Sequence, residues 1–267
     1  NLQNIPVKTE AGKLIRKAFV PEYDYLISFD YSQIELRVLA HLANVASLID
    51  AFNHDKDIHR HTASVVFGVS EEEVTSTMRR NAKAVNFGII YGMSDYGLAE
   101  QLGVTVKEAK SFIEKYFEKY AEIKDYMNKS IAFGKENGYV STVLNRKRYI
   151  PEINEKNYMR QEFGKRLAMN SPIQGSAADI IKLAMIKVDQ LLKENHMKSK
   201  MILQVHDELI FDVYQDELDK MMKLVKEGME SAYQMKVELK GKKATNDIST
   251  FEEKQYGDIW TNDEYLQ

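Results

Sequence analysis

The chain has 267 residues, of which 44% are hydrophobic and 29% charged, and its formal net charge is −3. This composition predicts one large folded domain or two smaller ones, and the absence of cysteine excludes a disulfide scaffold, a thiolate metal site and a cysteine nucleophile. No apolar run approaches about 18 residues and no signal-peptide pattern opens the chain, so we expect neither a membrane span nor secretion. Residues 1–6 have the character of an internal segment, which predicts a fragment of a longer protein.

The first 25 residues show no clear periodicity and are predicted to be irregular. Their basic residues Lys13, Arg16 and Lys17 form either a solvated surface or a phosphate contact. Residues 26–29 are typical of a buried strand, and residues 33–42 have helical apolar spacing. Asp30 therefore lies where a strand ends and a helix begins, as either a helix cap or a ligand.

Two capping boxes mark helix starts in the next hundred residues. Ser70 is followed three residues later by Glu73, and Thr105 by Glu108, which is the reciprocal pattern of a capped first turn. The helices predicted in this region span about 57–68, 106–120 and 121–138.

A stripe of four side chains distinguishes the stretch from 78 to 92. Arg79, Lys83, Phe87 and Tyr91 recur every four residues, which on a helix puts two cations and two rings in one line. Cations suit phosphates and rings suit stacking, so the stripe indicates a polyanion that carries a base. The structural alternative is a solvated cationic face beside the edge of a core.

The remaining chain alternates strand-like and helical stretches. A basic turn at 145–148 lies between strand-like residues, and Pro172 with Gly175 predicts a break between two helices. The polar stretch from 240 onward has no clear period and is predicted to be a loop. The predicted elements are strands at 139–143 and 149–150, and helices at 157–170, 174–193 and 216–233.

Residues 201–212 consist of two apolar, strand-like runs around Asp207 and Glu208, which predicts a hairpin with two carboxylates at its tip. If this hairpin and the strand before Asp30 share a sheet, Asp30 and Asp207 can meet. Two close carboxylates repel unless divalent cations separate them, and oxygen ligands favour Mg²⁺ or Mn²⁺ over zinc. Two such ions can clamp the attacking and leaving oxygens of a phosphoryl transfer.

Three segments together resemble motifs A, B and C of the family A DNA polymerases. The resemblance covers nearly the whole chain except parts of the tail, and the motifs occur in the family's order. The segments that carry it are residues 30–37, 79–92 and 205–208, with further matches at 1–6, 57–59 and 170–179.

The resemblance implies an α/β right-hand fold with an antiparallel palm sheet, accompanying helices and a mostly helical fingers domain. It assigns residues 1–49 to the palm with motif A, 50–165 to the fingers with the motif B helix, and 166–267 to the palm with motif C. The thumb and any exonuclease are expected upstream. Residues 240–254 resemble an insertion before 256–260, which are similar to the family's usual ending.

The family's catalytic residues can be carried over position by position. The resemblance implies that Asp30, Asp207 and the Tyr31 carbonyl bind two Mg²⁺ ions, with Mn²⁺ as a possible substitute, and that Glu208 supports them. It makes Lys83 the candidate acid for the pyrophosphate leaving group.

The same comparison implies a nucleotide pocket and a DNA surface. Glu35 matches the steric gate against a ribose 2′-hydroxyl, and the helix of the stripe is expected to close onto a correct base pair. The implied dNTP-binding residues are Arg79, Lys83, Phe87, Tyr91, Glu35, His59 and Gln33. The implied DNA-binding residues are Arg37, Arg166, Asn170, Gln174 and His206.

The implied function is template-directed addition of deoxynucleotides to a primer 3′ end, with release of pyrophosphate. The expected partners are primer–template DNA and dNTPs, without a membrane, and the expected state is a monomer in the bacterial cytoplasm and nucleoid or inside an organelle. One alternative is a single-subunit RNA polymerase, against which Glu35 and Phe87 argue. The other is a catalytically inactive DNA-binding module, which would not need Asp30, Asp207 and Arg79 together.

Overall fold

The computed structural model describes residues 9–16, 18–243 and 249–250, without the side chains of residues 13, 16, 242, 243, 249 and 250. The basic residues Lys13, Arg16 and Lys17 and the family-like ending at 256–260 therefore lie outside what is described. The chain divides into two compact units. Unit 1 comprises residues 1–34, 180–234 and 239–267, and unit 2 comprises residues 35–179 and 235–238. Within the described ranges, no helix combines the length and apolar character that a membrane crossing requires.

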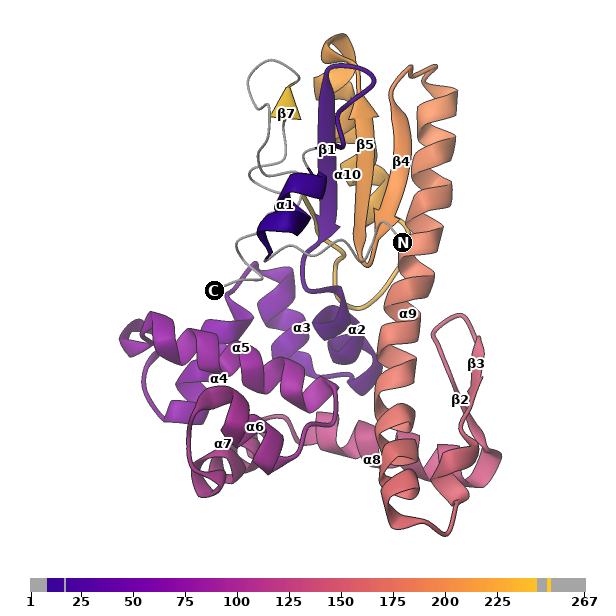
Figure 1. Ribbon diagram of the computed structural model, residues 1–267. Helices are drawn as coiled ribbons and strands as arrows, with labels where there is room; N and C mark the ends of the chain where they lie inside the picture. Colours follow the sequence, from indigo (N-terminus) through magenta and orange to yellow (C-terminus); the bar gives the residue numbers. More distant parts are fainter. Residues whose placement is uncertain (1–8, 17, 244–248, 251–267) are drawn as a thin grey trace. The chain divides into compact units, whose positions relative to one another are not determined.

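Unit 1 is built on an antiparallel sheet with strand order β4-β5-β1-β6, and β7 also pairs with β1 (Figure 1). The predicted strand before Asp30 and the predicted hairpin are both confirmed, and they are neighbours in this sheet. The loop predicted from residue 240 is wrong, because part of this segment pairs with β1. The strands span Tyr25–Tyr31 (β1), Lys200–Val205 (β4), Glu208–Val213 (β5), Gly241–Lys243 (β6) and Ser249–Thr250 (β7).

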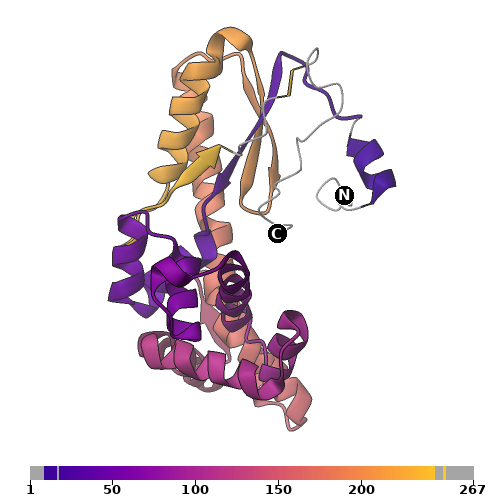
Figure 2. The ribbon, with the colours of Figure 1, turned by 90° about the vertical axis from the view of Figure 1, so that its left-hand side faces the viewer.

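Helix α10, Leu218–Glu230, and the C-terminal part of helix α9, Tyr158–Glu194, lie against one face of this sheet (Figure 2). Helix α10 buries an apolar stripe that includes Met221 and Val225. A Cβ at Gly228 would lie 2.5 Å from Val188 Cγ2, so α10 and the C-terminal part of α9 meet closely at this glycine. Helix α10 is shorter than predicted because a 3₁₀ turn, Gln215–Glu217, precedes it. Helix α1, Glu10–Arg16, forms where the sequence predicted irregular chain.

Unit 2 is mostly helical, and both predicted capping boxes are present. The Ser70–Glu73 box caps a 3₁₀ turn, whereas Thr105–Glu108 caps α7. The helices predicted at 33–42, 57–68, 106–120 and 121–138 are confirmed, but α3 and α6 were not predicted. The helices are α2 Ile34–Ala43, which starts at the unit boundary, α3 Ala46–Asn53, α4 Ile58–Phe67, α5 Ser76–Ile90, α6 Asp95–Leu102, α7 Val106–Lys119 and α8 Ala121–Asn137.

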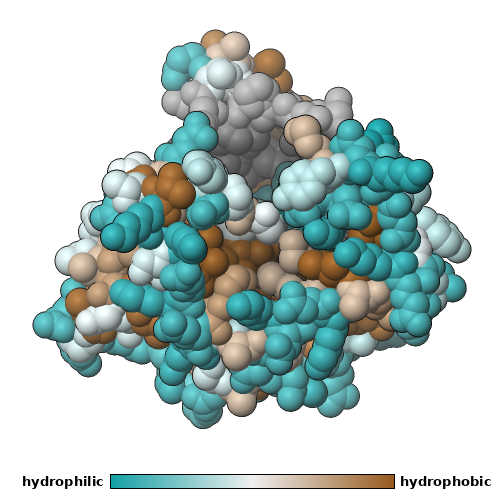
Figure 3. Space-filling view, turned by 90° about the horizontal axis from the view of Figure 1, so that it is seen from below, coloured by the Kyte–Doolittle hydropathy of each residue, from teal (hydrophilic) through white to brown (hydrophobic). Residues whose placement is uncertain are grey.

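Helices α4 and α5 share a small apolar core. Ala63 of α4 and Ala82 of α5 are buried with Val74, and Phe67 and Met78 pack against them. This packing joins the C-terminal half of α4 to the first half of α5, where the stripe begins. The surface in Figure 3 is mostly hydrophilic, with apolar residues distributed among charged ones.

The break predicted at residues 170–175 is wrong. Helix α9 runs from Tyr158 to Glu194 and contains Pro172. The Ser176 hydroxyl donates to the Pro172 carbonyl at 2.5 Å, so a side chain adds a hydrogen bond at this point. Gly175 lies inside the helix and does not stop it. A glycine is required there because α9 packs closely on Thr142: a Cβ added at Gly175 would lie 2.6 Å from Thr142 Cγ2. Thr142 lies in the loop of the hairpin formed by β2, Tyr139–Ser141, and β3, Lys147–Tyr149.

Candidate active site

Asp30 and Asp207 are brought together by the backbone of the unit 1 sheet. Asp30 lies opposite Glu208 in the β1–β5 register, and the Tyr31 N–H donates to the Asp207 carbonyl at 3.3 Å. Asp30 is inside β1 and does not cap α2, which begins at Ile34. The hairpin turn is His206–Asp207, one residue earlier than predicted, so Glu208 is the first residue of β5. His206 takes a left-handed φ of 52° at this turn.

The carboxyl groups of Asp30 and Asp207 interact directly, and Asp207 is partly buried. Burial raises the pKa of the Asp207 carboxyl above its usual range, although His206 and a side-chain hydrogen bond with Asp30 act in the opposite direction. Glu208 is held separately, because its carboxylate accepts a hydrogen bond from the Ser28 hydroxyl. A partly buried acid pair of this kind is stabilised by a cation.

The two carboxylates fit a divalent ion whose remaining ligands come from water and from a bound phosphate. Among the residues that the structure describes, no group of three or more His, Asp or Glu side chains could hold a metal by itself. Mg²⁺ commonly uses one or two carboxylates and completes its shell with water and substrate phosphates. Asp30 and Asp207 provide two carboxylates for this arrangement.

The predicted stripe lies on α5 in unit 2, with Tyr91 as the residue after the helix. The Phe87 and Tyr91 rings are stacked, with centroids 6.3 Å apart. Arg79 Nε contacts Asp57 Oδ2 at 2.6 Å, so an acid of the α4 N-cap offsets the charge of this cation. Burial alone would raise the pKa of Asp57, but hydrogen bonds from Arg79 and the Arg60 backbone lower it below its usual value.

Three of the predicted residues meet around Tyr91. The Tyr91 hydroxyl donates to Glu35 Oε2 at 2.9 Å, and the Asn170 side-chain amide donates to the Tyr91 carbonyl at 3.1 Å. Helices α2 and α9 and the residue that follows α5 therefore each contribute one polar side chain to a connected group within unit 2.

His59 follows the Asp57 cap of α4 and is 2% exposed. Its Nδ1 lies 3.0 Å from the side-chain nitrogen of Asn86, and its ring centroid lies 6.1 Å from that of Phe87. Burial and the nearby Arg79 and Lys83 cations lower the pKa of His59 to about 4, so the ring is neutral at pH 7. No role was predicted for Asn86, although it lies next to Phe87 within the segment that resembles motif B.

The residues predicted to contact DNA lie in different environments. Arg37 is 5% exposed, donates to the Glu238 carbonyl at 2.6 Å, and has its guanidinium 4.5 Å above the Phe52 ring. Arg166 and Gln174 are exposed on α9, and His206 is exposed at the hairpin turn of unit 1. Gln33 takes a left-handed φ of 55° between β1 and α2. The roles of these residues stay predictions.

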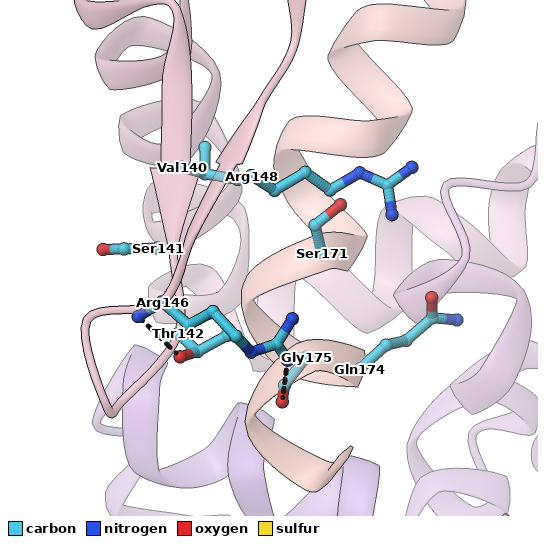
Figure 4. Close-up of a pocket in the computed structure, with 8 residues that line it drawn as sticks. All are labelled: Val140, Ser141, Thr142, Arg146, Arg148, Ser171, Gln174 and Gly175. Carbon is cyan, nitrogen blue, oxygen red and sulfur yellow. Dashed lines mark hydrogen bonds between the residues drawn. The ribbon is translucent and has the colours of Figure 1, made fainter. Parts of the chain in front are cut away.

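Gln174 lines a small hollow between α9 and the β2–β3 hairpin (Figure 4). Arg146 of the basic turn contacts Asp179 Oδ1 at 2.8 Å and the Gly175 carbonyl at 3.0 Å. Arg148 extends from β3 toward Ser171 in the same view. The basic turn was the signal for these two arginines, but the sequence analysis gave them no role. The lining residues are Val140, Ser141, Thr142, Arg146, Arg148, Ser171, Gln174 and Gly175.

Comparisons with known proteins agree on one family. The sequence model described as DNA polymerase family A matches residues 1–248. DNA polymerase I of Caldicellulosiruptor bescii is 57% identical over 240 residues, and that of Bacillus subtilis is 55% identical over 242 residues. Each alignment covers 90% of this chain but only 28% of the relative, so the chain spans little more than a quarter of these proteins.

A solved structure gives the same result at the level of the fold. It is the POL domain of Pol1 from M. smegmatis in complex with DNA primer-template and dNTP. The match has a TM-score of 0.86 and 48% sequence identity, and it covers 91% of this chain and 43% of that chain. The expected fold class, a polymerase fold with an antiparallel sheet and helices, is confirmed.

Proposed function

This chain belongs to DNA polymerase family A, and from this premise we propose that it adds deoxynucleotides to a primer 3′ end on a DNA template and releases pyrophosphate. The observation that carries the proposal is the pairing of Asp30 with Asp207 at the end of an antiparallel sheet. The helix with Arg79, Lys83, Phe87 and Tyr91 supports it, because cations and stacked rings suit a nucleoside triphosphate.

The acids of unit 1 would serve the chemical step. Asp30, Asp207 and the Tyr31 carbonyl would hold two Mg²⁺ ions, for which Mn²⁺ could substitute. When bound, such ions stabilise the charge that develops on the attacking and leaving oxygens. Glu208 would keep this arrangement ordered through its hydrogen bond with Ser28.

The α5 stripe would bind the incoming nucleotide. Arg79 and Lys83 would hold the triphosphate, and Lys83 would donate a proton to the pyrophosphate as it leaves. Phe87 and Tyr91 would line the base and sugar pocket, to which Gln33 would also contribute. Glu35, held by the Tyr91 hydroxyl, would exclude a ribose 2′-hydroxyl. We also propose that α5 rotates onto a correct base pair.

The DNA would be held by side chains from several elements. Asn170 and Gln174 would read minor-groove acceptors, which every correct pair presents in similar places. The arginine-lined hollow beside Gln174 supports this assignment, because DNA affinity depends largely on phosphate contacts. Arg37, Arg166 and His206 would complete the contacts.

The domain assignment stays a proposal. It treats residues 1–49 and 166–267 as palm and 50–165 as fingers, whereas the compact units meet at 34/35 and 179/180. A thumb and other domains would be supplied by a longer protein, and its activity, partners and bacterial or organellar location are proposed on the same premise.

Primer extension tests the proposed function. The chain, alone and within the longer protein, would be assayed on a short primer–template with Mg²⁺, with dNTPs or rNTPs, and beside the Asp207→Ala variant. We expect extension with dNTPs that the variant loses by at least about 1,000-fold, because a metal ligand contributes several kcal/mol. Efficient rNTP use would favour an RNA polymerase. DNA binding without extension in both forms would contradict the proposal and favour an inactive module.

A further inference from the structure

The side chain of Asn86 determines which nitrogen of the His59 ring carries the proton. Asn86 lies on α5, is 1% exposed, and has its amide nitrogen 3.0 Å from His59 Nδ1. The Thr62 hydroxyl of α4 donates to the Asn86 amide oxygen at 3.1 Å. With its oxygen engaged by Thr62, the amide directs an N–H toward the ring.

The charged groups around His59 favour a neutral ring. Arg79 and Lys83 repel a third positive charge, Asp57 attracts one, and burial removes the water that would stabilise it. A neutral imidazole has one protonated and one unprotonated nitrogen. Because an amide N–H faces Nδ1, the unprotonated nitrogen is Nδ1 and the proton resides on Nε2.

We propose that Asn86 is a positioning residue that locks His59 in the neutral Nε2–H tautomer, so that the ring offers an N–H donor to a phosphate oxygen of the incoming nucleotide. The identity of this ligand rests on the proposed function, whereas the tautomer does not. A neutral donor adds a directional hydrogen bond next to Arg79 and Lys83 without adding a third cation. The lock also joins α4 to α5 through buried polar atoms.

The tautomer can be measured without any enzymatic assay. The chain would be prepared with ¹⁵N-labelled histidine, and two-bond ¹H–¹⁵N spectra would be recorded at pH 7, with a His59→Phe variant to assign the signal among the six histidines. We expect an unprotonated Nδ1 and a protonated Nε2. Asn86→Asp should reverse this pattern or protonate both nitrogens, because a carboxylate accepts from Nδ1–H. A protonated Nδ1 in the parent, or no change in Asn86→Asp, would overturn the proposal.

Inorganic triphosphate then tests the ligand. We expect it to shift the His59 Nε2–H resonance in the parent and to shift it much less in Asn86→Leu. A shift of equal size in both would show that Asn86 does not position the ring for phosphate. This titration and the tautomer spectra remain decisive even if the chain extends no primer, so failure of the proposed function would be distinguished from failure of the lock.

Single-turnover incorporation, in the longer protein if it needs its other domains, separates positioning from stability. Asn86→Leu should weaken apparent dNTP affinity by about tenfold, the effect of one lost hydrogen bond to a charged group. Val74→Ala is the matched control, because Val74 belongs to the α4–α5 core but not to the hydrogen-bonded group of His59, Asn86 and Thr62. It should lower Tm but keep dNTP affinity. In a His59→Phe background, Asn86→Leu should cause no further loss of affinity. An additive loss there, or an equal loss in Val74→Ala, would indicate a merely structural Asn86.

Discussion

The acids of unit 1 and the cations of unit 2 are positioned by different kinds of interaction. Asp30 lies in β1 and Asp207 in the turn that leads into β5, so the pairing of β1 with β5 and the Tyr31 N–H to Asp207 carbonyl hydrogen bond bring the two acids together. Arg79 and Tyr91 lie on or beside one helix and are oriented by side-chain partners, namely Asp57 and Glu35. The backbone of the sheet and its hairpin therefore places these acids, and the side-chain hydrogen bond between Asp30 and Asp207 adds to this placement.

The acids of unit 1 and the cations of unit 2 should therefore respond differently to substitution and to ligand binding. A residue placed by sheet register keeps its position when its side chain is changed, so a substitution reports mainly on its chemistry. A residue oriented by an exposed ion pair or a single hydrogen bond can take a second partner, such as a phosphate, at small cost. The unit 2 residues are thus suited to exchange partners when a nucleotide binds.

Lys83→Ala should give the largest effect that distinguishes chemistry from positioning. If Lys83 protonates the leaving pyrophosphate, its loss should slow single-turnover incorporation by about 100- to 10,000-fold, the usual range for a general acid. Primer–template affinity, measured by fluorescence anisotropy, should change little. Equal losses in rate and in DNA affinity would assign Lys83 to binding alone.

Glu35→Ala should weaken sugar discrimination by about 10- to 200-fold, the range available to a steric contact. The change removes both the proposed gate and the acceptor of the Tyr91 hydroxyl. The readout is the ratio of dNTP to rNTP incorporation efficiencies. Tyr91→Phe is the matched control, because it removes the hydrogen bond but keeps the gate. If both variants lose discrimination equally, the ordering of Glu35 matters more than its bulk.

The elements of unit 1 were largely predictable because their signals are local. Two apolar, strand-like runs around Asp207 and Glu208 predicted the hairpin, and the run before Asp30 predicted its neighbour in the sheet. The pairing of β6 and β7 with β1 was not predictable, since these strands are short and their pairing depends on the free edge of a distant strand. The continuity of α9 through Pro172 likewise depends on contacts with the β2–β3 hairpin and on the Ser176 hydroxyl.

The candidate site likewise combines features that local sequence predicts with contacts that it does not. Helical spacing was enough to align Arg79, Lys83 and Phe87 on one helix. Nothing in that spacing could show that Asp57 approaches Arg79 or that Asn86 approaches His59, because both contacts require α4 to pack on α5. Interactions between elements were therefore missed even where each residue lies in a segment that resembles the family.

Asp57→Ala should destabilise the fold by about 1 kcal/mol, the usual cost of removing a helix N-cap. Asp57 accepts from the His59 and Arg60 backbone N–H groups, so Asp57→Asn should keep most of this stability and lose only the charge that faces Arg79. Because the folded pKa of Asp57 lies below its ordinary value of 3.8, its charge-dependent contribution is present above that value and lost as the pH falls through the folded pKa. Urea unfolding at neutral and acidic pH measures both effects, and an Asn variant as unstable as Ala would refute the capping explanation.

Asp207→Asn should have the smallest effect on stability, and its sign should depend on the metal. Burial raises the folded pKa of Asp207, so the charged carboxyl costs stability increasingly as the pH rises from its unfolded value through the folded one. Without divalent ions at neutral pH, the neutral variant should therefore melt at a slightly higher temperature than the parent. Added Mg²⁺ should raise the Tm of the parent more than that of the variant. The ion binds the Asp207 carboxylate of the folded parent and so stabilises the fold, whereas the variant lacks this carboxylate. A lower Tm for the metal-free variant would mean that the carboxylate stabilises the turn itself, and the acids of unit 1 would then also depend on side-chain partners, as the cations of unit 2 do.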